Sequence, residues 1–242
     1  MRPIVVALVL ALTGCGPVPR VAPPLPPPPV TPPILVLPAE PPVPVAPVAL
    51  PRVRVDGPAF VTDAGRFRWR GVSAFPLAFF IATGRATEAD AFMAWAAAQD
   101  VTELRVFAMA THLFDLPPDV GRGVTARVLD MAARHGLYVE LVALADTASY
   151  TFDRRVQVRT LGEQCAASTS CLGVQVANEA DHPTQAPDIR DRASLQSLAD
   201  LVPAPALVTC APAHGADDER PTYFSCGDYV TVHVDRADGE RG

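Results

Sequence analysis

Asn178 and Glu179 stand together directly after an apolar run, and this pair is the part of the sequence best suited to chemistry. Asn178 is the only asparagine in the chain, and the run 172–177 before it predicts a buried strand bounded by turn-forming residues. A carboxylic acid at the end of a strand can transfer a proton, and an adjacent amide can hold a sugar hydroxyl. Together they predict the proton donor of an acid-catalysed glycosidase.

The N-terminus predicts an export signal. Arg2 precedes an apolar run over 4–12, which is too short to span a membrane core of about 30 Å but has the length of a secretory signal. Residues 12–15 read Leu-Thr-Gly-Cys and resemble a bacterial lipobox, which implies lipid attachment to Cys15. The alternative is an ordinary signal peptide with an incidental cysteine. We expect residues 1–15 to be a lipoprotein signal peptide and the protein to be exported and lipid-anchored in the bacterial cell envelope.

A proline-rich segment over 16–51 follows this signal. Because proline fixes φ and lacks an N–H, the segment favours extended polyproline II and cannot build a packed core. We expect it to be a linker that holds a domain over 52–242 away from the membrane. The alternative, a proline-rich recognition ligand, is disfavoured by the few basic residues around it.

Composition limits the partners and cofactors. The net charge is −6, lysine is absent and no basic stripe is visible, which disfavours nucleic-acid binding. Four cysteines remain after Cys15, an even number that suits disulfides in an oxidising compartment. Three pairings are open, and sequence proximity favours Cys165 with Cys171 and Cys210 with Cys226. Zinc is a weaker alternative because no C-x-x-C spacing occurs, and no cofactor or metal is expected.

Strand-like and helix-like segments alternate through the remaining residues. This alternation predicts βαβ units and a parallel sheet. An eight-fold (β/α)8 TIM barrel and an open doubly wound sheet both satisfy the pattern, and the lack of a glycine-rich loop after the first strand favours the barrel. We expect strands to start near 67, 103, 138, 172, 206 and 229. We expect helices over 87–96, from 121 or 125 to 135, over 152–164 and over 189–201.

The order of the strand-end residues resembles the clan A glycoside hydrolases, family 5 (cellulase-like) most closely. The matching residues are Arg70-Gly71-Val72 on the first strand, Arg105 on the second, Asn178-Glu179 on the fourth and His233 on the sixth. The resemblance covers about residues 53 to 242. It implies that Glu179 is the general acid/base of a retaining enzyme and that Asn178 holds the sugar 2-hydroxyl. Arg105 would orient the nucleophile, and His233 would shape the same site.

Alternatives stay open for each of these residues. Glu179 is otherwise a solvated carboxylate, Arg105 a salt bridge at the barrel mouth, and His233 a structural histidine. His182 follows the acid and is expected either to bind substrate or to cap a loop.

Other side chains near strand ends are candidates for substrate binding. Aromatic rings can stack on sugars, so Phe75, Phe79, Phe80 and Tyr150 are candidate platforms. Asp146 ends the third strand and is a candidate partner for a hydroxyl.

The chain departs from the family pattern at the nucleophile. In the family this residue is a glutamate at the end of the seventh strand, and no glutamate here occupies a matching position. We therefore expect a barrel truncated after strand six, which would be a monomer when complete. The alternative to a hydrolase that cleaves O-glycosidic bonds in a poly- or oligosaccharide is a non-catalytic carbohydrate-binding envelope lipoprotein.

Overall fold

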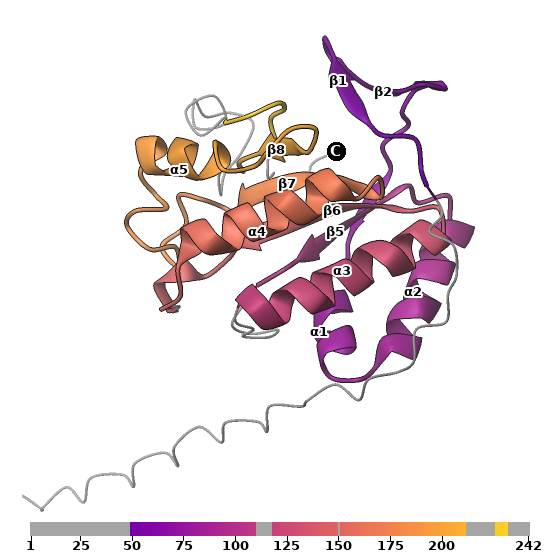
Figure 1. Ribbon diagram of the computed structural model, residues 1–242, viewed down its shortest axis with the longest axis horizontal. Helices are drawn as coiled ribbons and strands as arrows, with labels where there is room; N and C mark the ends of the chain where they lie inside the picture. The colour runs from indigo at the N-terminus through magenta and orange to yellow at the C-terminus, as the bar shows by residue number, and fades with distance from the viewer. Residues whose placement is uncertain (1–48, 110–117, 150, 212–225, 232–242) are drawn as a thin grey trace, which may run out of the picture. The chain divides into compact units, whose positions relative to one another are not determined.

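A five-stranded parallel sheet forms the centre of the protein, with the strand order β4-β5-β6-β7-β8 (Figure 1). The computed structural model describes residues 49–109, 118–149, 151–211 and 226–231. Strands that follow one another in the chain are also neighbours in the sheet, as in a (β/α)8 barrel. The predicted fold class is therefore confirmed. The strands are β4 (Gly71–Ser73), β5 (Glu103–Phe107), β6 (Tyr138–Leu144), β7 (Cys171–Ala177) and β8 (Leu207–Thr209).

Helices connect these strands and cover one face of the sheet. In Figure 1, α3 and α4 lie across β5, β6 and β7. Buried side chains such as Leu141 and Val174 point from the strands into this helical layer and form the main core. The helices are α1 (Leu77–Ala82), α2 (Ala86–Ala98), α3 (Pro118–Arg134), α4 (Arg154–Ala167) and α5 (Arg192–Ala199), with a 3-10 turn, η1, at Thr147–Ser149.

The other face of the sheet, here called the inner face, carries the polar residues of the strands. All residues of β6 and β7 are buried, which explains their nearly continuous apolar sequences. Side chains alternate between the two faces, so Glu103 and Arg105 on β5 share the inner face with Glu140 on β6. The strand register pairs Arg105 with Glu140, which places these two charges side by side.

A small antiparallel sheet precedes the barrel strands. It consists of β1 (Arg54–Asp56), β2 (Ala59–Thr62) and β3 (Gly65–Arg66). Phe60, Phe67 and Trp69 pack with Tyr138 and other apolar residues at one end of the inner face.

Several predicted boundaries differ from the structure. The first parallel strand begins at Gly71 rather than near 67, because Phe67 and Trp69 belong to the aromatic packing just described. The helix predicted over 87–96 is longer, because α2 begins at Ala86 and ends at Ala98; its N-cap is Arg85, whose guanidinium pairs with Glu88 in the first turn. The strand predicted to start near 229 is not seen at 229–231, and the residues from 232 onward lie outside the described part of the chain.

Two disulfides follow the pairing that sequence proximity favoured. Cys165 in α4 is bonded to Cys171 at the start of β7, and Cys210 after β8 is bonded to Cys226. The first bond joins a helix to the strand that leads to Asn178. Among the described residues, no helix is both long enough and apolar enough to cross a membrane.

Gly173 marks a position where the sheet has no room for a side chain. A Cβ added there would lie 2.8 Å from the backbone oxygen of Leu207 on the neighbouring strand. Gly173→Ala should therefore lower the free energy of unfolding by about 1–3 kcal/mol, measured by chemical denaturation. Gly123→Ala is the matched control: a Cβ on this exposed position of α3 meets nothing within 4 Å, and alanine should stabilise the helix by about 0.5–1 kcal/mol. Equal effects of the two substitutions would contradict this account of the β7–β8 contact.

Candidate active site

Arg105 joins two strands at the inner face. Its Nε donates to Oε1 of Gln175 at 2.8 Å, and its Nη2 donates to Oδ1 of Asn178, also at 2.8 Å. The structure thus brings together Arg105 and Asn178, which lie 73 positions apart in the chain. Because the amide oxygen faces Arg105, the amide N–H2 of Asn178 remains to donate to a ligand.

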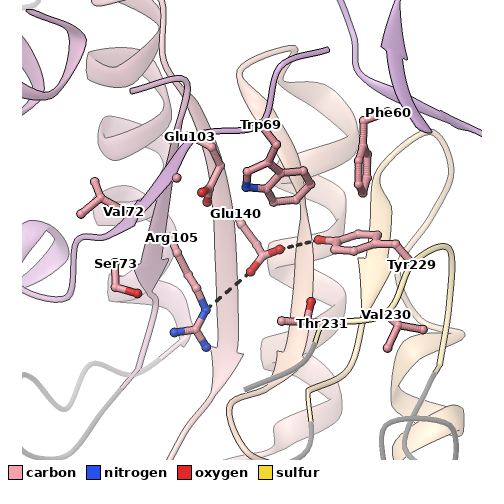
Figure 2. A pocket seen from close by; sticks show the side chains of 11 residues that line it. Phe60, Trp69, Val72, Ser73, Glu103, Arg105, Glu140, Tyr229, Val230 and Thr231 are labelled. Atoms are coloured by element: carbon pink, nitrogen blue, oxygen red, sulfur yellow. Dashed lines mark hydrogen bonds and ion pairs between the residues drawn. The ribbon is translucent and has the colours of Figure 1, made fainter. Parts of the chain in front are cut away.

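Glu140 on the neighbouring strand forms an ion pair with Arg105 and is itself hydrogen-bonded by Tyr229. The Glu140 carboxylate lies 3.6 Å from Arg105 Nε and accepts a hydrogen bond from the Tyr229 hydroxyl at 2.5 Å (Figure 2). Arg105 is 15% exposed and Glu140 only 3% exposed. Burial lowers the pKa of Arg105 and raises the pKa of Glu140, and in both cases the charge of the partner opposes that shift.

Glu103 lies on the same face, two residues before Arg105. It is 3% exposed, and burial, followed by the nearby charge of Glu140, raises its pKa to about 8. Gly71 on β4 gives this carboxyl its space, because a Cβ at Gly71 would overlap Glu103 Oε2. Glu103 is therefore mostly protonated at neutral pH.

Glu179 occupies a tight turn after β7. Its φ is +48°, a left-handed conformation that is uncommon for residues other than glycine. The Asn178 N–H donates to Leu144 O at 2.8 Å, and the Ala180 N–H donates to Ala211 O at 2.8 Å, so backbone bonds fix the turn on both sides. Glu179 is half-buried, and its charge acts on Arg105.

A buried glutamine supports the same turn. Gln185 donates to the backbone oxygen of Asn178 through Nε2 and accepts a 2.7 Å bond from the Thr147 hydroxyl through Oε1. Gln185 and Thr147 are both buried. The loops after β6 and β7 are therefore joined by one side chain.

Three further residues predicted to bind substrate, His182, Asp146 and Phe75, lie within the described part of the chain. His182 follows the Glu179 turn, with its N–H donating to Glu179 O, and its ring nitrogen contacts the Thr184 hydroxyl. Asp146 lies two residues after the end of β6, with a φ of +51°. Phe75 packs on Phe107, with ring centroids 4.5 Å apart, and the Arg105 guanidinium lies 4.9 Å from the Phe107 ring.

Phe79 and Phe80 were expected to stack on a sugar, and the structure contradicts this expectation. They lie on α1 and pack against the helical core, because residues 77–82 form a helix that the sequence analysis missed. Tyr150, His233 and Cys15 lie outside the described residues.

Sequence reasoning also missed Glu103, Glu140, Gln175, Gln185 and Tyr229. For Glu103 and Glu140 a signal was present, because each is an acid within an otherwise apolar strand. In the described part of the chain, no group of three or more His, Cys, Asp or Glu side chains could hold a metal ion.

Neither a scan against protein-family models nor a search of curated proteins gives a match. Solved structures of similar fold are found. One is a GH5_18 protein from Bifidobacterium longum subsp. infantis, with a TM-score of 0.53 and 15% identity, covering 69% of this chain and 50% of that one. A second is a beta-glucanase from Saccharophagus degradans in complex with cellotetraose, with a TM-score of 0.52, 18% identity and coverages of 68% and 54%. A third is a glycoside hydrolase family 5 protein from Bacteroides vulgatus, with a TM-score of 0.51, 11% identity and coverages of 66% and 39%.

The fold is that of the family 5 glycoside hydrolases. The resemblance given by the strand-end residues is thus confirmed at the level of fold. The chain spans about half the length of the solved structures it matches, with 50% of the first and 54% of the second covered.

The raised pKa of Glu103 predicts a pH dependence of stability. A carboxyl whose pKa is higher in the folded than in the unfolded protein binds more protons when folded, so it stabilises at low pH. This stabilisation is lost as the pH rises from the unfolded pKa, about 4.3, towards the folded value of about 8. Between pH 5 and 7, the free energy of unfolding of the wild type should fall relative to Glu103→Gln by about 1.4 kcal/mol per pH unit, measured by urea denaturation. Parallel curves for the two proteins would show that Glu103 titrates normally.

Proposed function

We propose that this chain belongs to a retaining glycoside hydrolase that cleaves O-glycosidic bonds in a β-linked poly- or oligosaccharide. Glu179 is the general acid/base, Asn178 binds the sugar 2-hydroxyl, and Arg105 orients the site. The observation that carries this proposal is the Arg105–Asn178 hydrogen bond at 2.8 Å, which links the second and fourth barrel strands beside Glu179. The fold similarity to a beta-glucanase in complex with cellotetraose supports a β-linked substrate.

The roles follow from the chemistry of a retaining mechanism. One carboxyl protonates the leaving oxygen while a second attacks the sugar, with the two groups about 5–5.5 Å apart. Glu179 lies in the turn after β7 and is half-buried, and its charge acts on Arg105. The attacking carboxylate has to come from a residue other than the matched ones. His233 is proposed to shape the site, with Phe75, Asp146, His182 and Tyr150 as substrate-binding residues.

The second candidate is a non-catalytic carbohydrate-binding protein. The observation in its favour is that the matched residues supply a proton donor and a hydroxyl-binding amide but no attacker. Such a protein would bind cellotetraose without releasing shorter products.

Glu179→Gln tests the acid role in the full-length protein. It should lower kcat/KM for cellotetraose by about 10²–10⁴-fold, because the leaving oxygen then receives no proton. Cleavage of dinitrophenyl β-cellobioside, whose leaving group needs no proton, should fall much less in its first step, measured as the burst of dinitrophenol. The matched control is Glu163→Gln, an exposed acid on α4, which should leave both reactions unchanged. Full cleavage of cellotetraose by Glu179→Gln would remove Glu179 from the acid role, and a wild type that binds but never cleaves would favour the second candidate.

We also propose export and lipid attachment at Cys15, on the basis of the apolar run and the Leu-Thr-Gly-Cys segment. In a bacterial host fed labelled palmitate, the wild type should carry label and sediment with membranes. Cys15→Ser should lose the label and leave the membrane fraction. Label that persists in Cys15→Ser would contradict the assignment.

A further inference from the structure

The segment 178–185, here called the Glu179 loop, is closed on itself by one side chain. The His182 N–H donates to Glu179 O at 2.9 Å, and the Gln185 N–H donates to His182 O at 2.9 Å, so the backbone turns back after β7. The Gln185 side chain then returns to the first residue of the loop, where its Nε2 donates to Asn178 O. The conformation around Glu179 therefore depends on a residue at the far end of the loop.

The Gln185 amide has only one possible orientation. Its Oε1 accepts from the Thr147 hydroxyl at 2.7 Å and from the Thr147 N–H at 3.3 Å. A backbone N–H can only donate, so the amide oxygen must face Thr147 and the amide N–H2 must face Asn178. The Thr147 hydroxyl in turn accepts from the Ala186 N–H at 2.8 Å. Because Gln185 is 2% and Thr147 0% exposed, solvent does not replace these bonds when they are lost.

The bond from Gln185 restrains the peptide group that joins Asn178 to Glu179. The oxygen that accepts this bond belongs to that peptide group, and the φ of Glu179 is the rotation that directly follows it. This φ is +48°, a strained value that a glutamate keeps only where its surroundings hold it. Without the bond, the peptide group is free to rotate and Glu179 to relax towards negative φ. The direction in which its carboxyl leaves the backbone would then no longer be fixed.

The same bond completes the restraint of Asn178. Its N–H donates to Leu144 O at 2.8 Å, its carbonyl oxygen accepts from Gln185, and its Oδ1 accepts from Arg105 at 2.8 Å. In the described part of the chain, this leaves its side-chain N–H2 to donate to a ligand. Gln185 thus acts on both members of the Asn178–Glu179 pair.

We propose that Gln185, oriented by Thr147, is a positioning residue for Glu179. It holds the 178–179 peptide group so that the acid directs its proton towards the leaving oxygen, and it contacts neither the substrate nor the reacting atoms. The inference rests on the proposed function, in which Glu179 is the general acid/base. It adds that the position of the acid is set by the loop after β6, which carries Thr147 in η1.

Gln185→Met in the full-length protein tests this role, because methionine keeps the length of the side chain and loses both polar groups. It should lower kcat/KM for cellotetraose by about 10–100-fold, since a misplacement of about 1 Å can have an effect of that size. The burst from dinitrophenyl β-cellobioside should fall by less than about threefold, because its leaving group needs no proton. Fewer folded molecules would lower both rates equally. In the Glu179→Gln background, Gln185→Met should have no further effect on cellotetraose, because the acid is already absent.

Gln164 provides the matched control in the helical layer. Its Oε1 accepts from the Thr125 hydroxyl at 2.7 Å, and its Nε2 donates to Arg122 O at 2.7 Å. Gln164→Met therefore removes the same two kinds of bond and should leave the ratio of the two substrates unchanged. The role is tested from its other end by Thr147→Val, which should change the ratio in the same direction as Gln185→Met, and by Thr147→Ser, which keeps the hydroxyl and should preserve the ratio. This second comparison decides the question if Gln185→Met does not fold.

Nuclear magnetic resonance gives a measurement that needs no turnover. Asn178 is the only asparagine, so labelling asparagine with 13C at its backbone carbonyl and glutamate with 15N gives one signal, from the 178–179 peptide group. In Gln185→Met the carbonyl resonance should move to lower frequency, because its hydrogen bond is lost, and should broaden or split as the peptide group rotates. Gln164→Met should keep the wild-type signal.

Each contrary result has a separate meaning. An unchanged 178–179 signal in Gln185→Met would overturn the inference whatever the activity. A changed signal with equal losses on both substrates would show that Gln185 supports the turn without positioning the acid. If Glu179→Gln loses cellotetraose cleavage selectively and Gln185→Met does not, this inference alone fails. A wild type that cleaves neither substrate would overturn the proposed function and the positioning role with it.

Discussion

The buried guanidinium of Arg105 is the group on which the candidate site depends. A charge that is 15% exposed is stable only where acceptors surround it, and Gln175, Asn178 and Glu140 provide them. A guanidinium is planar and directs its donors in fixed directions, so it orients whatever accepts from it. Arg105 therefore decides which end of the Asn178 amide faces a ligand. A lysine could not make the same pair of contacts from one plane.

The parallel sheet makes this arrangement possible through its strand register and through two glycines. Arg105 pairs with Glu140, and Glu140 pairs with Gly173, so three neighbouring strands contribute to one row. Two glycines in or beside that row leave space: Gly71 for the carboxyl of Glu103, and Gly173 for the backbone of Leu207. The polar inner face thus depends as much on positions without a Cβ as on charged residues.

Alternation and strand ends were readable from the sequence, whereas long-range side-chain partners were not. The run before Asn178 predicted β7 closely, because a continuous apolar strand bounded by turn residues has few other solutions. The role of Tyr229 was invisible, since it reaches Glu140 across 89 positions from a segment without strand structure. The helix over 77–82 was missed because its aromatic residues were assigned to sugar stacking. The disulfides were predictable because proximity in the chain limited their geometry.

The hydrogen bonds of the Gln185 side chain limit which loops of this protein can be exchanged separately. This side chain joins the Thr147 hydroxyl to the backbone of Asn178, so the loops after β6 and β7 are held together by hydrogen bonds. Grafting either connection from a relative on its own would leave buried polar atoms unmatched, which costs about 1–3 kcal/mol for each. Sequence changes in the loops after β6 and β7 should therefore be made in both loops together. Alternatively, they can be confined to residues 187–191, where most side chains are exposed.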